Sequence, residues 1–308
     1  MDTLLTITGP TACGKTALAV ALAYQLHGEI ISADSRQVFR HMDIGTGKDL
    51  LEYHFEGVDI PYHLIDIHDP GYEYNLYQFQ NDFIQAFHQI TARHRTPVLC
   101  GGTGMYVESV LRGYQLPDAP IDPDFRRTLE PFTDEELIQR LAGYITLHNH
   151  TDTESRDRLI RALEIQEFAR RHPDEHVQMP PMNHLVIGVA YSRQVIIERI
   201  EARLTSRLQQ GMIQEVENLL SSGVPAERLL RYGLEYRYLT LYLQGQITYE
   251  AMYEKLFTEI RRFAKRQMTW FRRMERNGIS IHWLDPDLTF EQKVQHVAEL
   301  YHKKNRES

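Results

Sequence analysis

Residues 9–16 read Gly-Pro-Thr-Ala-Cys-Gly-Lys-Thr, which is the pattern of a phosphate-binding loop (P-loop). An apolar run at 4–8 precedes the loop and an alanine- and leucine-rich run at 17–23 follows it, so it joins a strand to a helix. The glycines allow backbone N–H groups and the helix N-terminus to face an anion. Lys15 adds a charge for a terminal phosphate, and the Thr16 hydroxyl can hold Mg²⁺. The pattern predicts a di- or triphosphate site; a glycine-rich turn without a ligand is the alternative.

Strand and helix patterns alternate along the first third of the chain. Strand-like runs lie at 29–33, 62–67 and 96–100, and helical periodicity lies at 76–93 and 105–111. This alternation predicts an α/β fold of the P-loop NTPase type, with a doubly wound and mostly parallel sheet. Ligands in such sheets bind beside the carboxyl ends of the strands.

Two further segments follow strand ends and should join the P-loop in one crevice, namely Asp34-Ser35 and Gly101-Gly102-Thr103. Asp34 can contact a magnesium shell or act as a base, and a helix N-cap is the structural alternative. The third strand ends without an acidic residue, whereas nucleotide-hydrolysing P-loop enzymes keep an aspartate there for Mg²⁺. Asp66 is only a weak match for that aspartate, so the link to nucleotide hydrolysis is loose.

The middle of the chain differs from the first third. Helical segments at 134–148 and 154–172 lie between proline-containing linkers. We interpret residues 117–183 as a helical insertion domain. The P-loop core would then comprise 1–116 and 184–308, with helices in its C-terminal region.

Composition favours an ordinary cytoplasmic protein. Charged residues make up 25% and hydrophobic residues 42% of the 308, which is close to average globular usage. Two cysteines, Cys13 and Cys100, cannot form a disulfide scaffold, and the 15 histidines lack zinc-ligand spacing. No apolar run is long enough for a membrane span, and the first strand leaves no room for a signal peptide.

The last third is predicted to be helical, with periodic runs at 193–222 and 248–276 and a short polar tail at 303–308. Although the net charge is −8, the second run is strongly basic. Its eight basic residues are Lys255, Arg261, Arg262, Lys265, Arg266, Arg272, Arg273 and Arg276. The opposite helical face is apolar, with Phe257, Ile260, Ala264, Met268 and Phe271. A basic stripe suits an RNA backbone, and we expect Arg262, Arg266 and Arg273 to contact it; a solvated face is the alternative.

The chain resembles the tRNA dimethylallyltransferase family. The motifs that carry this resemblance are spread over almost the whole chain in the family's order. They lie at 9–16, 31–48, 100–113, 122–126, 156–164 and 264–273. The Asp-Ser-Arg-Gln-Val-Phe and Met-Asp-Ile-Gly-Thr combination within 31–48 is far more specific than the P-loop.

The resemblance implies that the P-loop binds dimethylallyl diphosphate and that the acceptor is the amine N6 of the adenine beside the anticodon. It implies a diphosphate site with Mg²⁺ on Thr16, formed by Gly9, Pro10, Thr11, Ala12, Cys13, Gly14, Lys15 and Thr16. Asp34 would be the base, with Thr103 against the same reacting region. Other residues implied to contact tRNA are Ser35, Arg36, Gln37, Arg126, Arg158 and Arg161.

One motif departs from the family pattern. The family often has an arginine three residues before Gly-Tyr-Arg, and here the segment 231–237 has Glu235 in the glycine position with Arg231 one residue further away. Either Arg231 is displaced or another residue has its role. No Cys/His zinc-finger pattern follows residue 276, which favours the bacterial type of the family. No obligate protein partner is implied.

Three alternatives remain open at this point. A P-loop kinase for a small molecule would use a nucleoside triphosphate and need no RNA. An RNA-binding protein with a vestigial P-loop would leave Asp34 and Thr103 without a task. An adenylate isopentenyltransferase would use free nucleotide, but the helical insertion and the basic helix favour tRNA.

Overall fold

The computed structural model describes residues 2–145, 153, 155–173 and 176–307. Two compact units make up the chain. The larger one consists of residues 1–112 and 180–308, and the smaller one of residues 113–179. The insertion was expected at 117–183, so each expected boundary lies four residues later in the chain than the observed boundary of the smaller unit.

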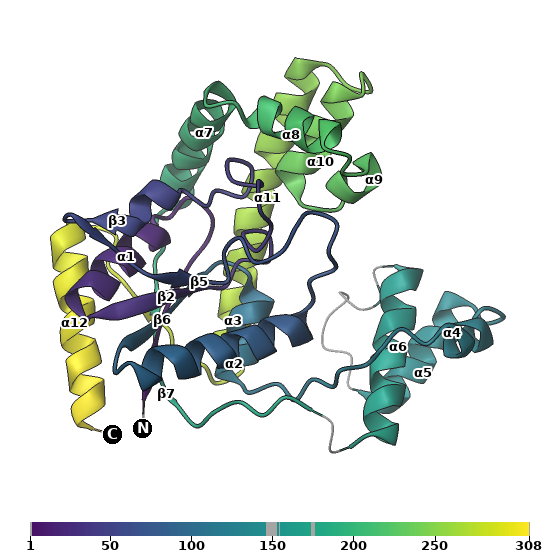
Figure 1. Ribbon diagram of the computed structural model, residues 1–308, viewed down its shortest axis with the longest axis horizontal. Coiled ribbons are helices and arrows are strands. Elements are labelled where there is room, and N and C mark those ends of the chain that lie inside the picture. The colour runs from purple at the N-terminus through teal and green to yellow at the C-terminus, as the bar shows by residue number, and fades with distance from the viewer. Residues whose placement is uncertain (1, 146–152, 154, 174–175, 308) are drawn as a thin grey trace. The chain divides into compact units, whose positions relative to one another are not determined.

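A six-stranded sheet forms the centre of the larger unit (Figure 1), and all of its strand pairs are parallel. Its order is β5-β2-β6-β1-β7-β8. The strands are β1 (Thr3–Thr8), β2 (Gly28–Ser32), β5 (Tyr62–His63), β6 (Thr96–Gly101), β7 (Asn183–Gly188) and β8 (His282–Trp283). The chain leaves β1 toward β2 on one side and returns across it to β7 on the other. This confirms the predicted doubly wound α/β fold.

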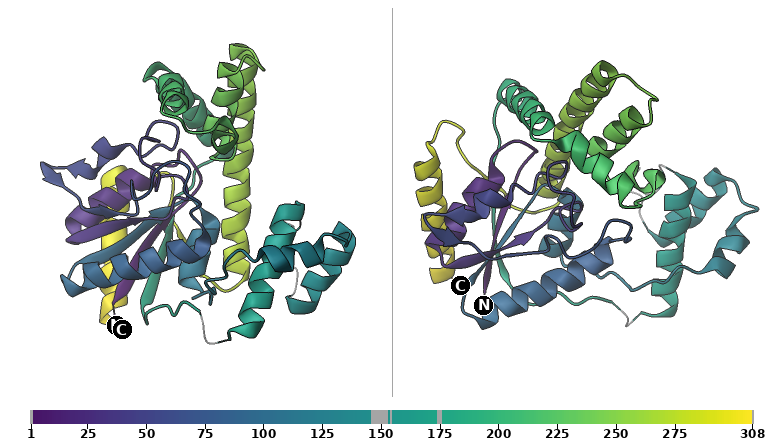
Figure 2. Two further views of the ribbon diagram at one scale, coloured as in Figure 1. Left: turned by 45° about the vertical axis from the view of Figure 1, so that its right-hand side comes forward. Right: turned by 45° about the horizontal axis from the view of Figure 1, so that its top comes forward.

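Helices cover both faces of the sheet. On one face α1 (Lys15–Gln25) packs against α12 (Phe290–Arg306), and on the other α2 (Leu76–Ala92) packs against β2, β6 and α3 (Gly104–Leu111) (Figures 1 and 2). The helical periodicity predicted at 76–93 is confirmed, and Phe79, Phe83, Phe87 and Ile90 on one face of α2 are buried. An Asn75 capping box starts this helix.

The long connection after β2 is held by a buried lysine. It contains a 3₁₀ helix, η1 (Leu50–Tyr53), and a two-stranded ribbon of β3 (His54–Phe55) and β4 (Val58–Asp59). The fully buried Lys48 Nζ donates to the Phe39 carbonyl at 2.7 Å and pairs with Asp43 at 2.5 Å and with Asp66. Asp66 therefore helps to hold this connection in place. The strand predicted at 62–67 is shorter than expected: β5 ends at residue 63, because the backbone turns to positive φ at 64 and 66.

The C-terminal region of the larger unit is helical, as predicted, but its boundaries differ. The helices are α7 (Arg193–Gln209), α8 (Met212–Ser221), α9 (Ala226–Leu229), α10 (Leu234–Leu243) and α11 (Tyr249–Arg276). The run predicted at 193–222 breaks at Gly211, where φ is +99°. The described part of the predicted polar tail, 303–307, is mostly exposed, but it belongs to the end of α12, which reaches Arg306 and was not predicted as a helix. This helix buries Val297 and Tyr301 against the core. Figure 2 shows α11 as one long helix.

The smaller unit is a three-helix cluster. It consists of α4 (Pro123–Leu129), α5 (Asp134–Tyr144) and α6 (Arg156–Arg171). Their shared core contains Leu129, Leu137, Leu141, Leu159 and Leu163. A linker was expected where α4 lies, but Pro123 occupies its first turn and Asp122 caps it, which a helix tolerates. The helix ends predicted at 146–148 and at 154 lie outside the described residues.

Within the described segments, no helix combines the length and the apolar character that a membrane span needs. Both cysteines are free and buried.

Replacing Lys48 with Met should lower the free energy of unfolding by about 1–3 kcal/mol, because two half-exposed carboxylates and a buried carbonyl lose their charged donor. The matched control is Lys303→Met, whose exposed pair with Glu307 at 4.0 Å should contribute less than about 1 kcal/mol. Urea midpoints measure both. Equal midpoints for the two variants would contradict the role given to Lys48.

Candidate active site

Three loops meet at the carboxyl edge of the sheet, because β6 lies between β1 and β2. The Thr8 hydroxyl of β1 donates to the Gly101 carbonyl at 3.0 Å, and the Ala33 N–H donates to the Cys100 carbonyl at 2.7 Å. Beyond the strands, the Ser35 N–H donates to the Thr103 hydroxyl at 3.3 Å. The structure thus brings the P-loop, Asp34 and Thr103 together in one site.

The P-loop begins with a close approach of two backbones. A β-carbon on Gly9, where φ is +156°, would collide with the Val189 carbonyl, so only glycine fits there. After Gly14 the chain enters α1, whose first residue is Lys15, and Thr16 lies in the same turn. The helix N-terminus is therefore placed where an anion is stabilised.

Asp34 stabilises a turn and does not cap a helix. Its carboxylate Oδ1 accepts from the Arg36 N–H at 2.9 Å, and residues 35–38 form turns. In the described part of the chain its other oxygen accepts no hydrogen bond. The half-buried carboxylate is thus oriented by one oxygen and keeps the other available as a proton acceptor.

The neighbours of Asp34 are fixed by their own contacts. Arg36 donates to the Arg231 carbonyl at 3.2 Å, and its guanidinium lies 5.9 Å from the Tyr232 ring centroid. Burial lowers the pKa of Arg36, while the Asp34 carboxylate opposes this shift. Gln37 accepts from the Ser32 hydroxyl at 2.8 Å and donates to the Gly47 carbonyl at 3.1 Å.

Helix α11 braces the site through a residue that sequence reasoning missed. The buried Gln267 accepts from the Thr11 N–H at 2.8 Å and donates to the Gly102 carbonyl at 2.8 Å. One side chain therefore ties the P-loop to the loop that carries Thr103. Its position between Ala264 and Phe271 on the apolar face was the signal that could have revealed it.

Arg273 does not belong to the exposed basic stripe that we expected on α11. Its guanidinium pairs with the buried Glu108 of α3 at 2.6 Å and lies 4.0 Å from the Trp270 ring centroid. We expected Arg273 to lie on the exposed basic face of this helix. That position is wrong, because the helix turns Arg273 toward α3. The basic residues that remain exposed are Lys255, Arg262, Lys265, Arg266, Arg272 and Arg276. Arg262 pairs with Glu259 at 2.5 Å, and a surface hollow is lined by Thr269, Arg272, Glu275 and Arg276.

Two of the three arginines expected to reach tRNA from the insertion share a structural partner. Arg126 and Arg161 pair with the buried Glu164 at 2.7 and 2.9 Å. Burial opposes ionisation of Glu164, but hydrogen bonds from Arg126 and its neighbours lower the pKa of this carboxyl below its ordinary value. Arg158 is exposed on the first turn of α6. Contact of these three residues with tRNA stays a prediction.

The side chains near the P-loop could hold Mg²⁺ only together with ligands that the protein does not supply. Among the described residues, no three His, Cys, Asp or Glu side chains gather as a metal site. Thr16 is half-buried at the first turn of α1 and offers one hydroxyl. This fits an ion whose remaining ligands are phosphate oxygens and water.

Comparisons with known proteins agree over nearly the whole chain. The family described as IPP transferase matches residues 37–274, and that described as isopentenyl transferase matches 2–62. A tRNA dimethylallyltransferase 2 of Porphyromonas gingivalis is 54% identical over 298 residues, covering 97% of this chain and 99% of the relative. A tRNA dimethylallyltransferase 1 of Geotalea uraniireducens is 52% identical, covering 96% and 97%.

Solved structures are similar as well. The tRNA isopentenylpyrophosphate transferase of Bacillus halodurans has a TM-score of 0.73 at 33% identity and covers 100% of this chain and 98% of its own. A eukaryotic dimethylallyltransferase acting on tRNA has a TM-score of 0.76 at 22% identity, covering 97% and 78%, and supports the fold alone.

Replacing Gln267 with Leu should destabilise the protein by about 1–3 kcal/mol, because two backbone groups lose their partner. It should also weaken binding of inorganic diphosphate, since the P-loop is no longer held at Thr11. The control is Gln295→Leu on the exposed face of α12. Thermal unfolding and titration calorimetry measure both effects; unchanged diphosphate affinity in folded Gln267→Leu would contradict the bracing role.

Proposed function

The chain belongs to the IPP transferase family, and on that basis we propose that it transfers a dimethylallyl group from dimethylallyl diphosphate to N6 of the adenine beside the tRNA anticodon. The proposal is supported by relatives named tRNA dimethylallyltransferase that are more than half identical over nearly the whole chain. The observation that carries it is the meeting of Asp34 and Thr103 with the P-loop at one edge of the sheet.

The P-loop would hold the leaving group. As the allylic C–O bond breaks, its electron pair stays on the diphosphate oxygen. Lys15 and the N-terminus of α1 would stabilise the negative charge that develops there. Thr16, with phosphate oxygens, would hold Mg²⁺, which neutralises part of the diphosphate charge when bound. Preorganised charge of this kind is usually the largest contribution to such a reaction.

Asp34 would serve the other reactant. The adenine amine attacks the allylic carbon, the C–N bond forms, and the amine proton passes to the carboxylate oxygen that has no partner in the described protein. The Thr103 hydroxyl, fixed by the Ser35 N–H, lies beside the same reacting region. The base must leave its stack to reach this point, which costs about a few kcal/mol, and Ser35, Arg36 and Gln37 would hold it there.

The exposed basic face of α11 would bind the tRNA backbone, because the same helix contacts the P-loop through Gln267. The smaller unit would add contacts through Arg158 and its neighbours. Because the proposed substrate is tRNA, we infer that the reaction takes place in the cytoplasm.

Incubation with radiolabelled dimethylallyl diphosphate and either unmodified tRNA or AMP tests the proposal. Label should appear in tRNA and not in AMP. Label in AMP alone would favour an adenylate isopentenyltransferase, and label in neither would reject the proposed activity.

Replacing Asp34 with Ala should lower turnover by about 10²–10⁴-fold, the usual effect of losing a general base. Binding of dimethylallyl diphosphate should change little, because Asp34 lies outside the P-loop. Asp287→Ala, on an exposed loop, is the control. Near-normal turnover of the Asp34 variant would show that another group takes the proton.

The double change Arg266→Gln/Arg272→Gln should weaken tRNA binding and make its salt dependence shallower, by roughly 0.7–0.9 in log–log slope for each phosphate that the protein no longer neutralises. The matched control is Lys303→Gln/Arg306→Gln on α12, with the same change of charge. Titrations at several salt concentrations compare the two. An equal slope for both variants would move the tRNA surface away from α11.

A further inference from the structure

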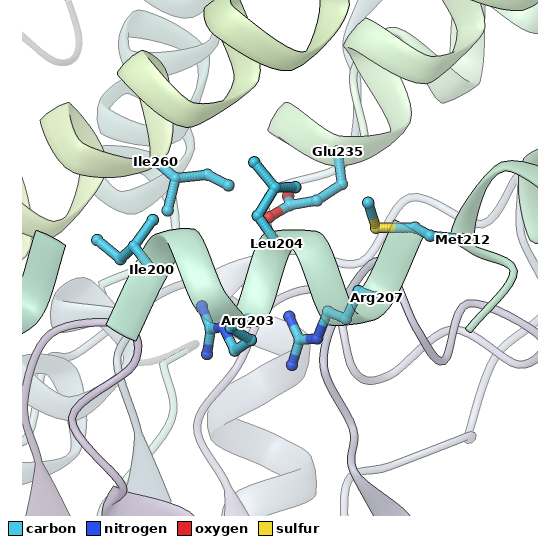
Figure 3. A pocket seen from close by; sticks show the side chains of 7 residues that line it. All are labelled: Ile200, Arg203, Leu204, Arg207, Met212, Glu235 and Ile260. Atoms are coloured by element: carbon cyan, nitrogen blue, oxygen red, sulfur yellow. The ribbon is translucent and has the colours of Figure 1, made fainter. Parts of the chain in front are cut away.

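The small cavity shown in Figure 3 adjoins the P-loop. Arg203 of α7 and Glu235 of α10 are among the residues that line it, and Arg203 donates to the Thr11 hydroxyl of the P-loop. This cavity therefore lies on the phosphate side of the site. The proposed reaction also needs groups that hold the adenine, and these must lie beside Asp34.

A buried tyrosine lies beside Thr103 and Asp34. Tyr106 is in the first turn of α3, where its N–H donates to the Thr103 carbonyl at 2.9 Å. The Thr103 hydroxyl in turn accepts from the Ser35 N–H. Arg36 and Asp34 both act electrostatically on the phenol group of Tyr106. The tyrosine thus belongs to the cluster that contains the proposed base.

The ring of Tyr106 is held in place by packing. It stacks on the ring of Phe79 of α2, with the centroids 4.0 Å apart and the planes at 19°. Phe79 is fully buried, and only 6% of Tyr106 is exposed. Because an enclosed and stacked ring has little freedom to turn, the position of its hydroxyl is preorganised.

The hydroxyl of Tyr106 has no hydrogen-bond partner in the described chain. Other buried tyrosines differ, since Tyr236 donates to Glu215 at 2.7 Å and Tyr301 donates to the Thr3 carbonyl at 3.3 Å. The Tyr106 hydroxyl is also absent from the fully enclosed polar atoms that lack a partner, so it faces space that a ligand can enter. A buried tyrosine hydroxyl usually has a partner, and this one is available to a substrate.

Its surroundings keep this hydroxyl a hydrogen-bond donor. Burial raises the pKa of Tyr106, Arg36 opposes the shift and Asp34 adds to it, so the phenol stays protonated at neutral pH. Tyr53 also has a hydroxyl without a partner in the described chain. Its strongest electrostatic neighbour is Cys100, however, which makes it a poorer match for a position beside Asp34.

The edge of adenine around N6 matches this pair of side chains. N6 carries hydrogens, and the ring nitrogens N1 and N7 on either side of it are acceptors. Asp34 offers an acceptor to N6, and Tyr106 offers a donor to a neighbouring nitrogen. Guanine has a carbonyl where adenine has the amine, so Asp34 would then face a second acceptor.

We propose that the Tyr106 hydroxyl donates a hydrogen bond to N1 or N7 of the flipped adenine and thereby positions N6 for its attack on the allylic carbon. This inference rests on the proposed function. The hydroxyl keeps its proton throughout the reaction, while the N6 proton passes to Asp34. Tyr106 therefore contacts the base and leaves diphosphate binding unaffected.

Tyr106→Phe removes the hydroxyl and keeps the ring that stacks on Phe79. The matched control is Tyr301→Phe on α12, because this tyrosine is equally buried, with 6% exposed. In the tRNA transfer assay, Tyr106→Phe should lose about 5–30-fold in kcat/KM, since an acceptor of the bound base loses its donor. Tyr301→Phe should match the wild type, and both variants should bind inorganic diphosphate normally.

Base analogues distinguish a contact from a structural effect. Each enzyme is assayed with tRNAs that carry adenine, 1-deazaadenine or 7-deazaadenine beside the anticodon; each analogue lacks one ring nitrogen and keeps the amine. The loss caused by Tyr106→Phe should disappear with the analogue that lacks the accepting nitrogen. The same loss with all three bases, or no loss with adenine, would overturn the proposal.

A measurement on the wild type keeps the test valid if the variant fails to fold. Titration with the three tRNAs should show at least one analogue bound about 5–30-fold more weakly than adenine. Equal affinity for all three would overturn the contact. A wild type that leaves adenine-containing tRNA unmodified would instead reject the proposed function.

Discussion

The pairing of β6 with both β1 and β2 is the constraint on which the site depends. It brings the ends of three parallel strands to one edge and sets the P-loop beside Asp34 and Thr103. Gln267 adds a further link between two of these loops, because its side chain bonds both the P-loop and the loop after β6.

Charged groups at the P-loop are balanced differently from several other buried charges of the described chain. Glu29 pairs with Arg93 at 2.6 Å and with His63 at 2.7 Å, and Glu108 pairs with Arg273, whereas the buried Lys293 donates to the Tyr191 hydroxyl and the Pro286 carbonyl. At the P-loop, Lys15 and Arg203 have no such carboxylate in the described chain. A folded protein that leaves two neighbouring cations uncompensated is prepared for an anionic ligand.

Sequence patterns predicted the features that depend on a short stretch of the chain alone. The strand–loop–helix unit at 9–16 and the apolar face of α2 follow from periodicity and from glycine at Gly9. Helix α12 was not predicted because most of its residues are polar, and its buried face consists of Lys293, Val297, Ala298 and Tyr301. Residue roles that depend on a distant partner could not be predicted in this way. Arg273 looks like a solvent-facing charge in sequence, and its partner Glu108 lies far along the chain.

The central claim is that the P-loop holds a diphosphate that leaves as adenine N6 is alkylated. The most direct measurement is a single-turnover reaction of the wild type with unmodified tRNA and dimethylallyl diphosphate labelled in both its allyl and phosphate parts. Mass spectrometry of the digested tRNA should locate the allyl label on N6 of the adenine beside the anticodon, with one diphosphate released for each adenine modified. Release of orthophosphate, or of diphosphate without modified adenine, would contradict the account.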